Sequence, residues 1–191
     1  MRTTVVDAPA RRHRRWAVRD DNGTMIETLR HPVEDDHARV MAVMDEWWGG
    51  LGGESGHLFR TSLLPRLYFQ HFTDTSYLLD LPGGKLGAFL IGFLSQSEPG
   101  VGYIHFVGVA PAVRRTGVGA ALYRRFFLDS AARGVRKVHS ITGTGNQQSV
   151  AFHTRLGFTL EPGDDEVDGL PVHRNYDGPG RDAFKFARHL P

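Results

Sequence analysis

Residues 113–126, VRRTGVGAALYRRF, place two arginines and two glycines directly before a run with helical spacing. A helix start exposes unpaired backbone N–H groups and the positive end of the helix dipole. Glycine lets an anion approach that backbone without meeting a Cβ atom, and the guanidinium groups of Arg114 and Arg115 match phosphate oxygens. The stretch therefore predicts a site for a phosphate-bearing ligand. The two glycines alone fit close packing of a helix on a sheet equally well.

Other motifs for phosphate binding or catalysis fit the chain badly. A dinucleotide fingerprint needs a third glycine where Leu122 stands, and the sole Gly-Lys pair is followed by Leu86 rather than Ser or Thr. A nucleophile elbow starting at Gly53 fails because position 57 is His57. The ten histidines include no His-Glu-x-x-His pattern, so a zinc hydrolase has no support and no metal is expected.

The composition is that of a single soluble domain. The chain has 191 residues, of which 40% are hydrophobic and 23% charged. It contains no cysteine, which excludes disulfides and thiolate chemistry. No apolar run is long enough to span a membrane and no secretory signal is apparent, so we expect no membrane partner and a cytoplasmic protein.

The basic charge is concentrated at the N-terminus. Residues 1–20 hold six arginines against Asp7 and Asp20, a net charge of +4, whereas the whole chain carries +2 and the remainder therefore −2. The RRHRR run at 11–15 favours a solvated tail over a nucleic-acid site. We predict a basic, flexible tail over 1–23 and one folded domain over 24–191, with nucleic acid not expected as a partner.

Hydrophobic periodicity predicts the element order β-α-α-β-β-β-α-β-α-β-β. Strands are expected at 24–32, 75–81, 85–96, 101–109, 136–144, 158–161 and 183–190, and helices at 35–48, 61–72, from the quoted stretch to about Gly134, and at 146–156. The glycine-rich segment 49–56 reads as a mobile loop. Strand 101–109 should be central because both faces are apolar or small. Strict alternation puts five of its side chains on one face: Val101, Tyr103, His105, Val107 and Val109.

Two segments resemble one known family. Arg114-x-x-Gly117-x-Gly119, preceded by VGVAP and followed by AALY, resembles the acyl-CoA-binding motif of the GNAT superfamily of N-acetyltransferases. The segment NQQSVAFHTRLGF at 146–158 resembles that superfamily's second signature, and the element order is similar from residue 24 to the C-terminus. The resemblance implies an α/β fold in one GNAT-like domain, with a mixed, mostly antiparallel central sheet of about 6–7 strands flanked by about four helices.

The resemblance also implies a site for acetyl-CoA as the acyl-donor cosubstrate. The backbone amides of 114–120 would hold the pyrophosphate. The backbone of Val107 and Val109 would pair with the pantetheine arm, and the Val109 N–H would polarise the thioester carbonyl. On the second signature, Asn146 would contact the pantetheine and Ser149 and Phe152 would line the cofactor, although core packing explains Phe152 nearly as well. The full cofactor-binding prediction is Val107, Val109, Arg114, Arg115, Thr116, Gly117, Val118, Gly119, Ala120, Asn146, Ser149 and Phe152.

Proton transfer is assigned to three residues. His153 stands where the family often has a tyrosine that protonates the departing thiolate, and it is either that acid or an ordinary surface histidine with water in the role. Strand 101–109 lacks the glutamate that often serves as base in the family. His105, with Tyr103 beside it, is the candidate base or water relay; a hydrogen-bonded core histidine is the alternative for His105.

The acceptor is expected to be a primary amine on a small molecule, a peptide or a protein. The early helices and the segment after Trp48 would border its site. Trp48 is expected either to wall that pocket or to complete the apolar face of helix 35–48, and for Trp47 the second interpretation is favoured. A non-catalytic acyl-CoA-binding module is the alternative function, and a homodimer is possible because dimers are common among similar proteins.

Overall fold

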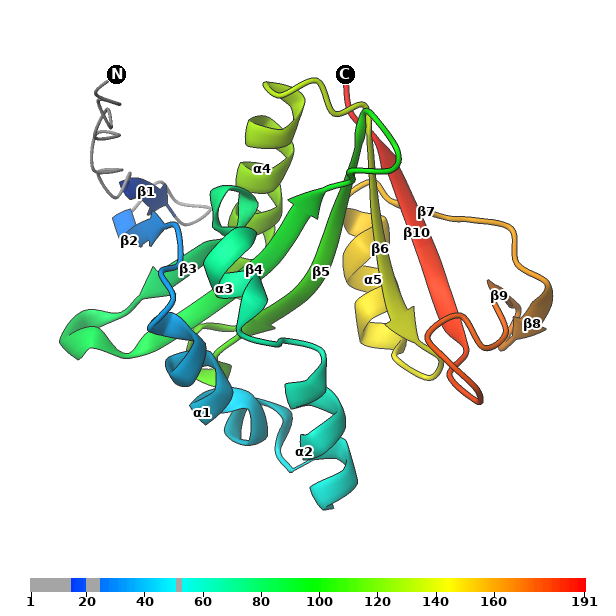
Figure 1. Cartoon of the computed structure of the whole chain (residues 1–191), viewed down its shortest axis with the longest axis horizontal. Helices are drawn as coiled ribbons and strands as arrows, with labels where there is room; N and C mark the ends of the chain where they lie inside the picture. The colour runs from blue at the N-terminus through cyan, green and yellow to red at the C-terminus, as the bar shows by residue number, and fades with distance from the viewer. Residues whose placement is uncertain (1–14, 20–24, 51–52) are drawn as a thin grey trace, which may run out of the picture.

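The computed structural model describes residues 15–19, 25–50 and 53–191, and its centre is a mixed eight-stranded sheet (Figure 1). The strand order is β1-β2-β3-β4-β5-β6-β10-β7, and β8 and β9 form a separate two-stranded sheet. The strands are β1 Arg15–Arg19, β2 Met25–Arg30, β3 Tyr77–Asp80, β4 Leu86–Leu94, β5 Val101–Val109, β6 Lys137–Gly143, β7 Thr159–Leu160, β8 Asp165–Val167, β9 Leu170–Val172 and β10 Ala183–His189. The α-helices are α1 Asp36–Trp48, α2 Gly53–Ser62, α3 Leu67–His71, α4 Val118–Ala131 and α5 Gln147–Arg155.

Adjacent strands are antiparallel except β5 and β6, which run parallel. The predicted fold class is therefore confirmed, with one strand more than the upper count. That strand, β1, lies within the segment predicted as a tail. Residues 1–14 and 20–23 of that segment lie outside the described residues, so its predicted flexibility stays a prediction.

Two hydrophobic cores cover opposite faces of the sheet. One core packs α4 and α5 against the sheet, with Leu122 and Phe126 of α4 fully buried. The other packs α1 and α3 on the opposite face, through residues such as Met44 and Phe69. Figure 1 shows α3 in front of β4, α1 and α2 below the strands, and α5 behind β6.

A β-bulge corrects the predicted faces of β5. Ile91 pairs with Phe106 and the next residue, Gly92, pairs with Ile104, so His105 is an extra residue with no partner on β4. The alternation therefore shifts by one at His105. Val107 and Val109 pack on the α4 core rather than on the face of Tyr103 and His105, and the prediction that all of them share one face was wrong.

Helices α2 and α3 also differ from the prediction. One helix was expected at 61–72 and a loop at 49–56, but α2 begins at Gly53 and ends at Ser62, and α3 begins only at Leu67. Pro65 explains the break, because proline has no N–H group and disfavours helical geometry at the residue before it. The β8–β9 hairpin lies in a polar segment for which no strand was predicted.

Candidate active site

The parallel pairing of β5 and β6 stops in the middle of both strands. It joins Val101–Ile104 to Lys137–Ser140, although β5 continues to Val109 and β6 to Gly143. At the last pair the Ser140 hydroxyl donates a hydrogen bond to the Ile104 carbonyl over 3.1 Å. In the described part of the chain, no strand pairs with β5 beyond this point on that edge.

The N–H groups of Val107 and Val109 face this open edge. The N–H of Ala110 donates to the Gly87 carbonyl, which extends the ladder between β5 and β4. Successive N–H groups of a strand point to opposite sides. Val109 and Val107 therefore direct their N–H groups away from β4, as a peptide-like ligand lying beside β5 requires.

Helix α4 starts next to this edge. Gly117 precedes it with φ of 86°, a left-handed conformation that glycine adopts without strain. The first backbone bond of the helix joins the Ala121 N–H to the Gly117 carbonyl, so the N–H groups of Val118, Gly119 and Ala120 have no partner within the helix. A Cβ atom added to Gly119 would lie 3.7 Å from a methyl carbon of Val109. The helix start and the open edge therefore form one continuous donor surface.

The two arginines before the helix differ in their contacts. Arg114 donates from Nε to the Val109 carbonyl over 3.1 Å and from Nη2 to the Trp47 carbonyl over 2.5 Å. Its guanidinium group thus joins the ends of β5 and α1. Arg115 is exposed and has a positive φ of 63°, and Thr116 donates to the Val113 carbonyl over 2.7 Å. Of the two side chains, Arg115 is the better placed to contact a phosphate in solvent.

The start of α5 is capped by one of the predicted residues. Asn146 accepts a hydrogen bond from the Ser149 N–H at 3.0 Å and donates to the Thr142 hydroxyl over 3.2 Å. The ring of Phe152 lies 3.4 Å from where a Cβ atom of Gly119 would be. Phe152 therefore packs against the start of α4, and Asn146 holds α5 beside the end of β6.

His153 is buried, with 4% of its surface exposed. Its Nδ1 lies 2.8 Å from the Ser149 carbonyl and its Nε2 lies 3.0 Å from the hydroxyl of Tyr123 on α4. The ring also stacks on Phe186 of β10 at a centroid distance of 4.4 Å. Because a carbonyl only accepts, Nδ1 carries the proton and Nε2 accepts from Tyr123. Both ring nitrogens are thus engaged within the protein, and no motif in the sequence predicted that Tyr123 belongs to this group.

Burial lowers the pKa of His153 below its usual value, although the contact with the Ser149 carbonyl opposes this. Its ring is therefore neutral at pH 7. The predicted residues of α5 are brought together, with Ser149 Oγ 3.2 Å from His153 Nδ1. This arrangement fits a structural role for His153 better than the surface position considered from the sequence.

His105 faces the opposite side of the sheet, next to α3. Its ring stacks on Tyr68 at 4.6 Å, and Nε2 lies 2.6 Å from the carbonyl of Leu63. That carbonyl lies in the break between α2 and α3, where no helical N–H group follows to bond it. Nε2 must therefore be the donor, which leaves Nδ1 as the acceptor of a neutral ring. Burial lowers the pKa of His105, so this neutral form prevails at pH 7.

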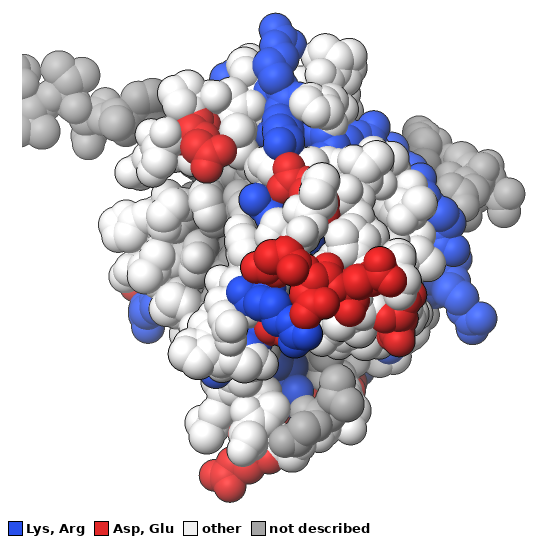
Figure 2. All heavy atoms as spheres, turned by 90° about the vertical axis from the view of Figure 1, so that its right-hand side faces the viewer, with Lys and Arg blue, Asp and Glu red and all other residues white. Residues whose placement is uncertain are grey.

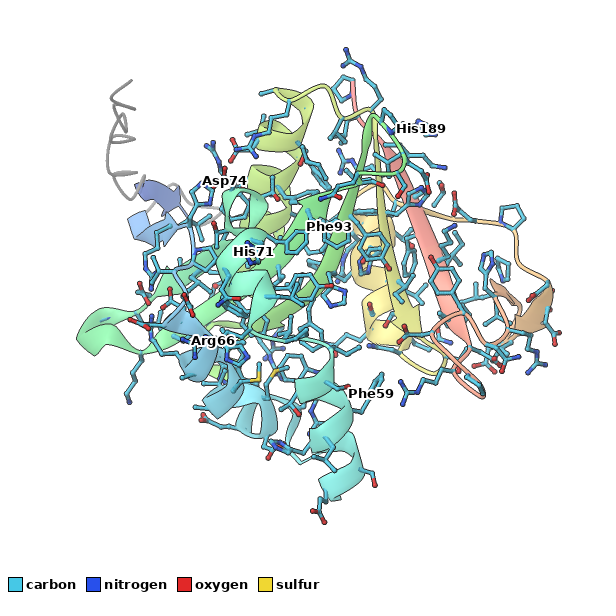
Figure 3. The ribbon with its side chains drawn as sticks, viewed as in Figure 1. Phe59, Arg66, His71, Asp74, Phe93 and His189 are labelled. Carbon is cyan, nitrogen blue, oxygen red and sulfur yellow. The ribbon has the colours of Figure 1, made fainter. Side chains whose placement is uncertain are left out.

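Tyr103 lies beside His105 on the same face, with 6.5 Å between ring centroids, and stacks on Phe93 at 5.4 Å. Figure 3 labels Phe93 between α3 and β5. Burial raises the pKa of Tyr103, so its phenol stays protonated near neutral pH. Two of the predicted catalytic residues thus lie together on the face away from α4, while the third, His153, lies in the core on the other side.

The helices that were expected to border the acceptor site are α1 and α2, and their aromatic side chains make contacts within the protein. Trp47 is buried and stacks on Phe89 at 5.7 Å, as favoured from the sequence. Trp48 packs on Phe106 at 5.5 Å. Further along, the guanidinium carbon of Arg181, before β10, lies 4.5 Å from the ring centroid of Phe59 on α2 (Figure 3). This contact joins α2 to the segment that precedes β10.

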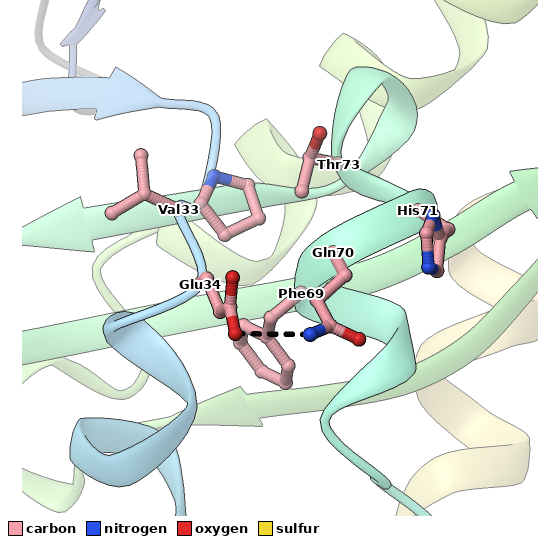
Figure 4. Close-up of a pocket in the computed structure, with 7 residues that line it drawn as sticks. Val33, Glu34, Phe69, Gln70, His71 and Thr73 are labelled. Atoms are coloured by element: carbon pink, nitrogen blue, oxygen red, sulfur yellow. Dashed lines mark hydrogen bonds between the residues drawn. The ribbon is translucent and has the colours of Figure 1, made fainter.

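A separate hollow of about 490 Å³ lies between the β2–α1 connection and α3 (Figure 4). Glu34 on its rim accepts hydrogen bonds from Gln70 over 2.9 Å and from Arg66 over 2.7 Å. None of its lining residues is a predicted site residue. The hollow contains none of these residues, so the candidate catalytic site is the open edge of β5.

Within residues 15–19, 25–50 and 53–191, no helix has the length and apolar character needed to cross a membrane. In the same residues, no three His, Asp or Glu side chains are grouped so that they could hold a metal ion.

Comparisons with known proteins point to one family. Residues 40–158 match the model of the acetyltransferase (GNAT) family. The chain is 28% identical over 152 residues to mycothiol acetyltransferase of Corynebacterium glutamicum, which covers 75% of this chain and 49% of that protein. The chain therefore spans about half the length of this relative.

Solved structures agree in fold. A GNAT-family protein from Desulfovibrio desulfuricans superposes with a TM-score of 0.65 at 17% identity, over 85% of this chain and 98% of that one. Diaminobutyrate acetyltransferase EctA from Paenibacillus lautus, solved with L-2,4-diaminobutyric acid and coenzyme A, gives a TM-score of 0.58 at 21% identity, over 83% of this chain and 92% of that one. At these identities the likeness establishes the fold alone.

Proposed function

Because the chain belongs to the GNAT family of acetyltransferases, we propose that it transfers the acetyl group of acetyl-CoA to a primary amine. The observation that carries this proposal is the unpaired edge of β5 next to the start of α4. The two together offer backbone donors for an extended chain and, at one end, for an anion. A pantetheine arm ending in a pyrophosphate has this combination of groups.

The predicted cofactor residues keep their roles in this proposal, except Arg114. The N–H groups of Val118, Gly119 and Ala120 would bind the pyrophosphate, and Arg115 would add charge. The open N–H groups of Val107 and Val109 would bind the pantetheine and the thioester oxygen. Arg114 would act by fixing the end of β5, since its side chain is already bonded to the carbonyls of Val109 and Trp47.

The chemistry requires a neutral amine. An alkylamine with a pKa of about 10.4 is neutral in only about one part in 2,500 at pH 7, which costs roughly 4–5 kcal/mol. Nδ1 of His105, on the face of the sheet away from α4, takes the amine proton directly or through water. The amine nitrogen then attacks the thioester carbonyl carbon, the N–C bond forms, and the C–S bond breaks.

The departing thiolate receives the last proton. A thiol pKa of about 8.5 makes this leaving group acceptable without a dedicated acid. Since both nitrogens of His153 are hydrogen-bonded within the protein, we assign the protonation to water and a positioning role to His153. The open edge of β5 supplies the electrostatic stabilisation through the Val109 N–H.

The direct test is release of free CoA thiol from acetyl-CoA with a panel of small amines and peptides, followed with a thiol reagent. We expect amine-dependent release together with a stoichiometric acetylated product. Tight CoA binding without turnover across the panel would instead select the alternative function, a non-catalytic acyl-CoA-binding module. The absence of both CoA binding and turnover would overturn the proposal.

Three further predictions belong with this function. The acceptor amine belongs to a small molecule, a peptide or a protein, the composition favours a cytoplasmic location, and similar proteins favour a homodimer. We also keep the division into a basic N-terminal tail and one catalytic domain. Light scattering of the purified chain tests the dimer, and truncation of residues 1–14 tests whether catalysis needs the tail.

A further inference from the structure

A small cavity of about 110 Å³ lies beside Tyr103, on the face of the sheet away from α4. Tyr103 lines it from β5, His139 from β6 and Lys185 from β10, and Tyr176 contributes from the segment before β10. The Tyr103 ring that lines the cavity is 6.5 Å from the ring of His105. The cavity therefore lies on the side of the proposed base rather than on the side of α4.

The lining of the cavity contains one basic and one acidic side chain, Lys185 and Glu98. Lys185 Nζ lies 3.1 Å from Glu161 Oε2, and Lys137 Nζ lies 2.9 Å from the other oxygen of the same carboxylate. Two ammonium groups thus share Glu161, and of the two only Lys185 lines the cavity. Glu98 is exposed and also interacts electrostatically with Lys185. Burial opposes the charge of Lys185, but its contacts with Glu161 outweigh burial and raise its pKa, so it is charged at pH 7.

The polar groups around Lys185 suit an anion. Its Nζ lies 5.7 Å from the ring centroid of Tyr176, so the ammonium group lies beside the tyrosine that borders the cavity. Ser95, Tyr103 and Tyr176 add hydroxyl groups to the lining. Hydroxyls can donate to a carboxylate, and the volume accommodates a group of a few heavy atoms.

The segment 173–182 is fixed by its own hydrogen bonds. The Asn175 N–H donates to Asp182 over 2.8 Å, and Asn175 in turn accepts from the Gly180 N–H at 2.7 Å. Acidic side chains gather around the β8–β9 hairpin on this side of the molecule (Figure 2), but Arg174 pairs with Asp165 and Asp182. Arg174 thus neutralises Asp165 and Asp182, so these two acids do not offset the positive charge of Lys185.

An acidic group also lies near the proposed base. Asp177 of the same segment interacts electrostatically with both His105 and Tyr103. Asp177 therefore favours a cation beside both rings, whereas Lys185 is the lining group that can bind an anion. A molecule that carries an ammonium group and a carboxylate matches these two charges.

We propose that the cavity lined by Lys185, Tyr103 and Tyr176 binds the carboxylate of the acceptor, so that the acceptor is an amino acid whose reacting amine lies at His105. This inference rests on the proposed acetyl transfer and narrows its substrate class. Lys185 is the residue that determines the preference, because it is the charged donor of the cavity. Its neighbour Lys137 binds the same Glu161 from outside the cavity.

The test uses pairs of acceptors that differ only in the carboxylate. L-2,4-diaminobutyric acid, L-ornithine and L-lysine are compared with 1,3-diaminopropane, 1,4-diaminobutane and 1,5-diaminopentane, first by thiol release and then by calorimetric binding to the CoA-loaded protein. We expect at least one acid to exceed its diamine at least about tenfold in kcat/KM. Equal or weaker use of the acid in every pair, or no binding of any acid, overturns the inference.

The variants Lys185→Gln and Lys137→Gln identify the residue responsible. Lys185→Gln should lower the acid-to-diamine ratio of kcat/KM about tenfold, because it removes the charge beside the cavity. Lys137→Gln breaks an equivalent contact with Glu161 and should leave the ratio unchanged. Equal ratios in all three proteins would overturn the inference while acetyl transfer to the diamines still stood. Loss of CoA binding and of all turnover in the unmodified chain would show that the proposed function had failed.

Discussion

The Ser140 hydroxyl donates a hydrogen bond to the Ile104 carbonyl over 3.1 Å, at the last residue pair that joins β5 to β6. Ser140 is buried, with 4% of its surface exposed. The bond satisfies the final carbonyl of the paired edge, just before His105 bulges out and the strands separate. One side chain therefore marks the boundary between a closed sheet and the open edge that serves the proposed reaction.

Ser140→Ala should lower the free energy of unfolding by about 0.5–1.5 kcal/mol, because it removes a hydrogen bond to a buried carbonyl. Urea denaturation gives this value. Ser62→Ala is the matched control, since Ser62 also donates to a carbonyl, that of Phe59, but at an exposed position of α2. A loss in Ser140→Ala no larger than in the control would show that water replaces the hydroxyl.

Gly119→Glu should weaken CoA binding at least about tenfold, or about 1.4 kcal/mol. The new carboxylate would lie at the unpaired N–H groups of α4 and would repel a pyrophosphate. Gly119→Ala is the control, because its Cβ atom would make only ordinary contacts of 3.4 Å or more with Phe152 and Val109. Calorimetry with CoA measures both variants, and an unchanged affinity in Gly119→Glu would refute the site.

The rate should depend on the protonation of His105. Burial holds its pKa below the usual 6.5, so the ring is neutral at pH 7 and becomes protonated only as the pH falls through that lowered value. We expect kcat/KM to fall with it. His105→Gln keeps a donor for the Leu63 carbonyl but has no titrating base, so it should lower kcat/KM about 10²-fold and abolish this acidic limb.

His37→Gln provides the comparison, because His37 Nε2 lies 3.0 Å from the Leu64 carbonyl in a similar contact away from β5. Its pH–rate profile should match that of the unmodified chain. An acidic limb that persisted in His105→Gln would assign the base to another group.

The sequence was sufficient for the fold because its signals are local. Strand 101–109 and the helix beginning at Val118 coincide with β5 and α4 since apolar runs, glycines and the phosphate motif all lie within one short stretch. The donors at the start of α4 were predictable for the same reason, because every helix start exposes them.

The rest depended on contacts between distant segments. The bulge at His105 arises from the register with β4, which no periodicity along β5 alone contains. The hydrogen bond between His153 and Tyr123 joins residues that are 30 positions apart, on different helices. Lys185 and Tyr103 line one cavity although more than eighty residues separate them, so the proposed carboxylate site had no counterpart in the sequence.

The pair of Tyr123 and His153 should stabilise the core as a unit. His153→Phe removes the His153 acceptor of the buried Tyr123 hydroxyl, which also contacts Ser140, and Tyr123→Phe leaves Nε2 of His153 without its donor; each should cost about 1–3 kcal/mol. The double variant should cost less than the sum of both, because no buried polar partner is left alone. A double-mutant cycle measured by denaturation decides this, and strict additivity would contradict it.

The same histidine predicts a pH effect on stability. Burial lowers the pKa of His153 in the folded state, so the unfolded chain binds its proton first as the pH falls from about 6.5. Stability should therefore be lost as the pH falls toward and through the lowered folded pKa. His153→Phe should show a smaller loss over this range than the unmodified chain.

An ion-pair network fixes the start of α1 to the sheet. Arg30 of β2 binds both carboxylate oxygens of Asp36, at 2.7 and 2.8 Å, and its Nε lies 2.6 Å from Asp80. Arg39 contacts the same two acids, each at 2.6 Å. Two arginines and two aspartates thus alternate in a closed ring, with Asp36 only 2% exposed.

Asp36→Ala should lower the free energy of unfolding by about 3–5 kcal/mol, since it leaves two guanidinium groups with half of their partners in a partly buried position.

Burial alone would raise the pKa of Asp36, but the hydrogen bonds from Arg30, the Val33 N–H and Arg39 outweigh it and lower the pKa below 3.8. The stabilisation is therefore present above that pH and is lost as the pH falls through the folded value. Thermal unfolding between pH 7 and pH 2 should show a steep acid loss in the unmodified chain and in the exposed control Asp35→Ala, and a shallower one in Asp36→Ala. Parallel curves for all three proteins would mean that the ring contributes nothing to acid stability.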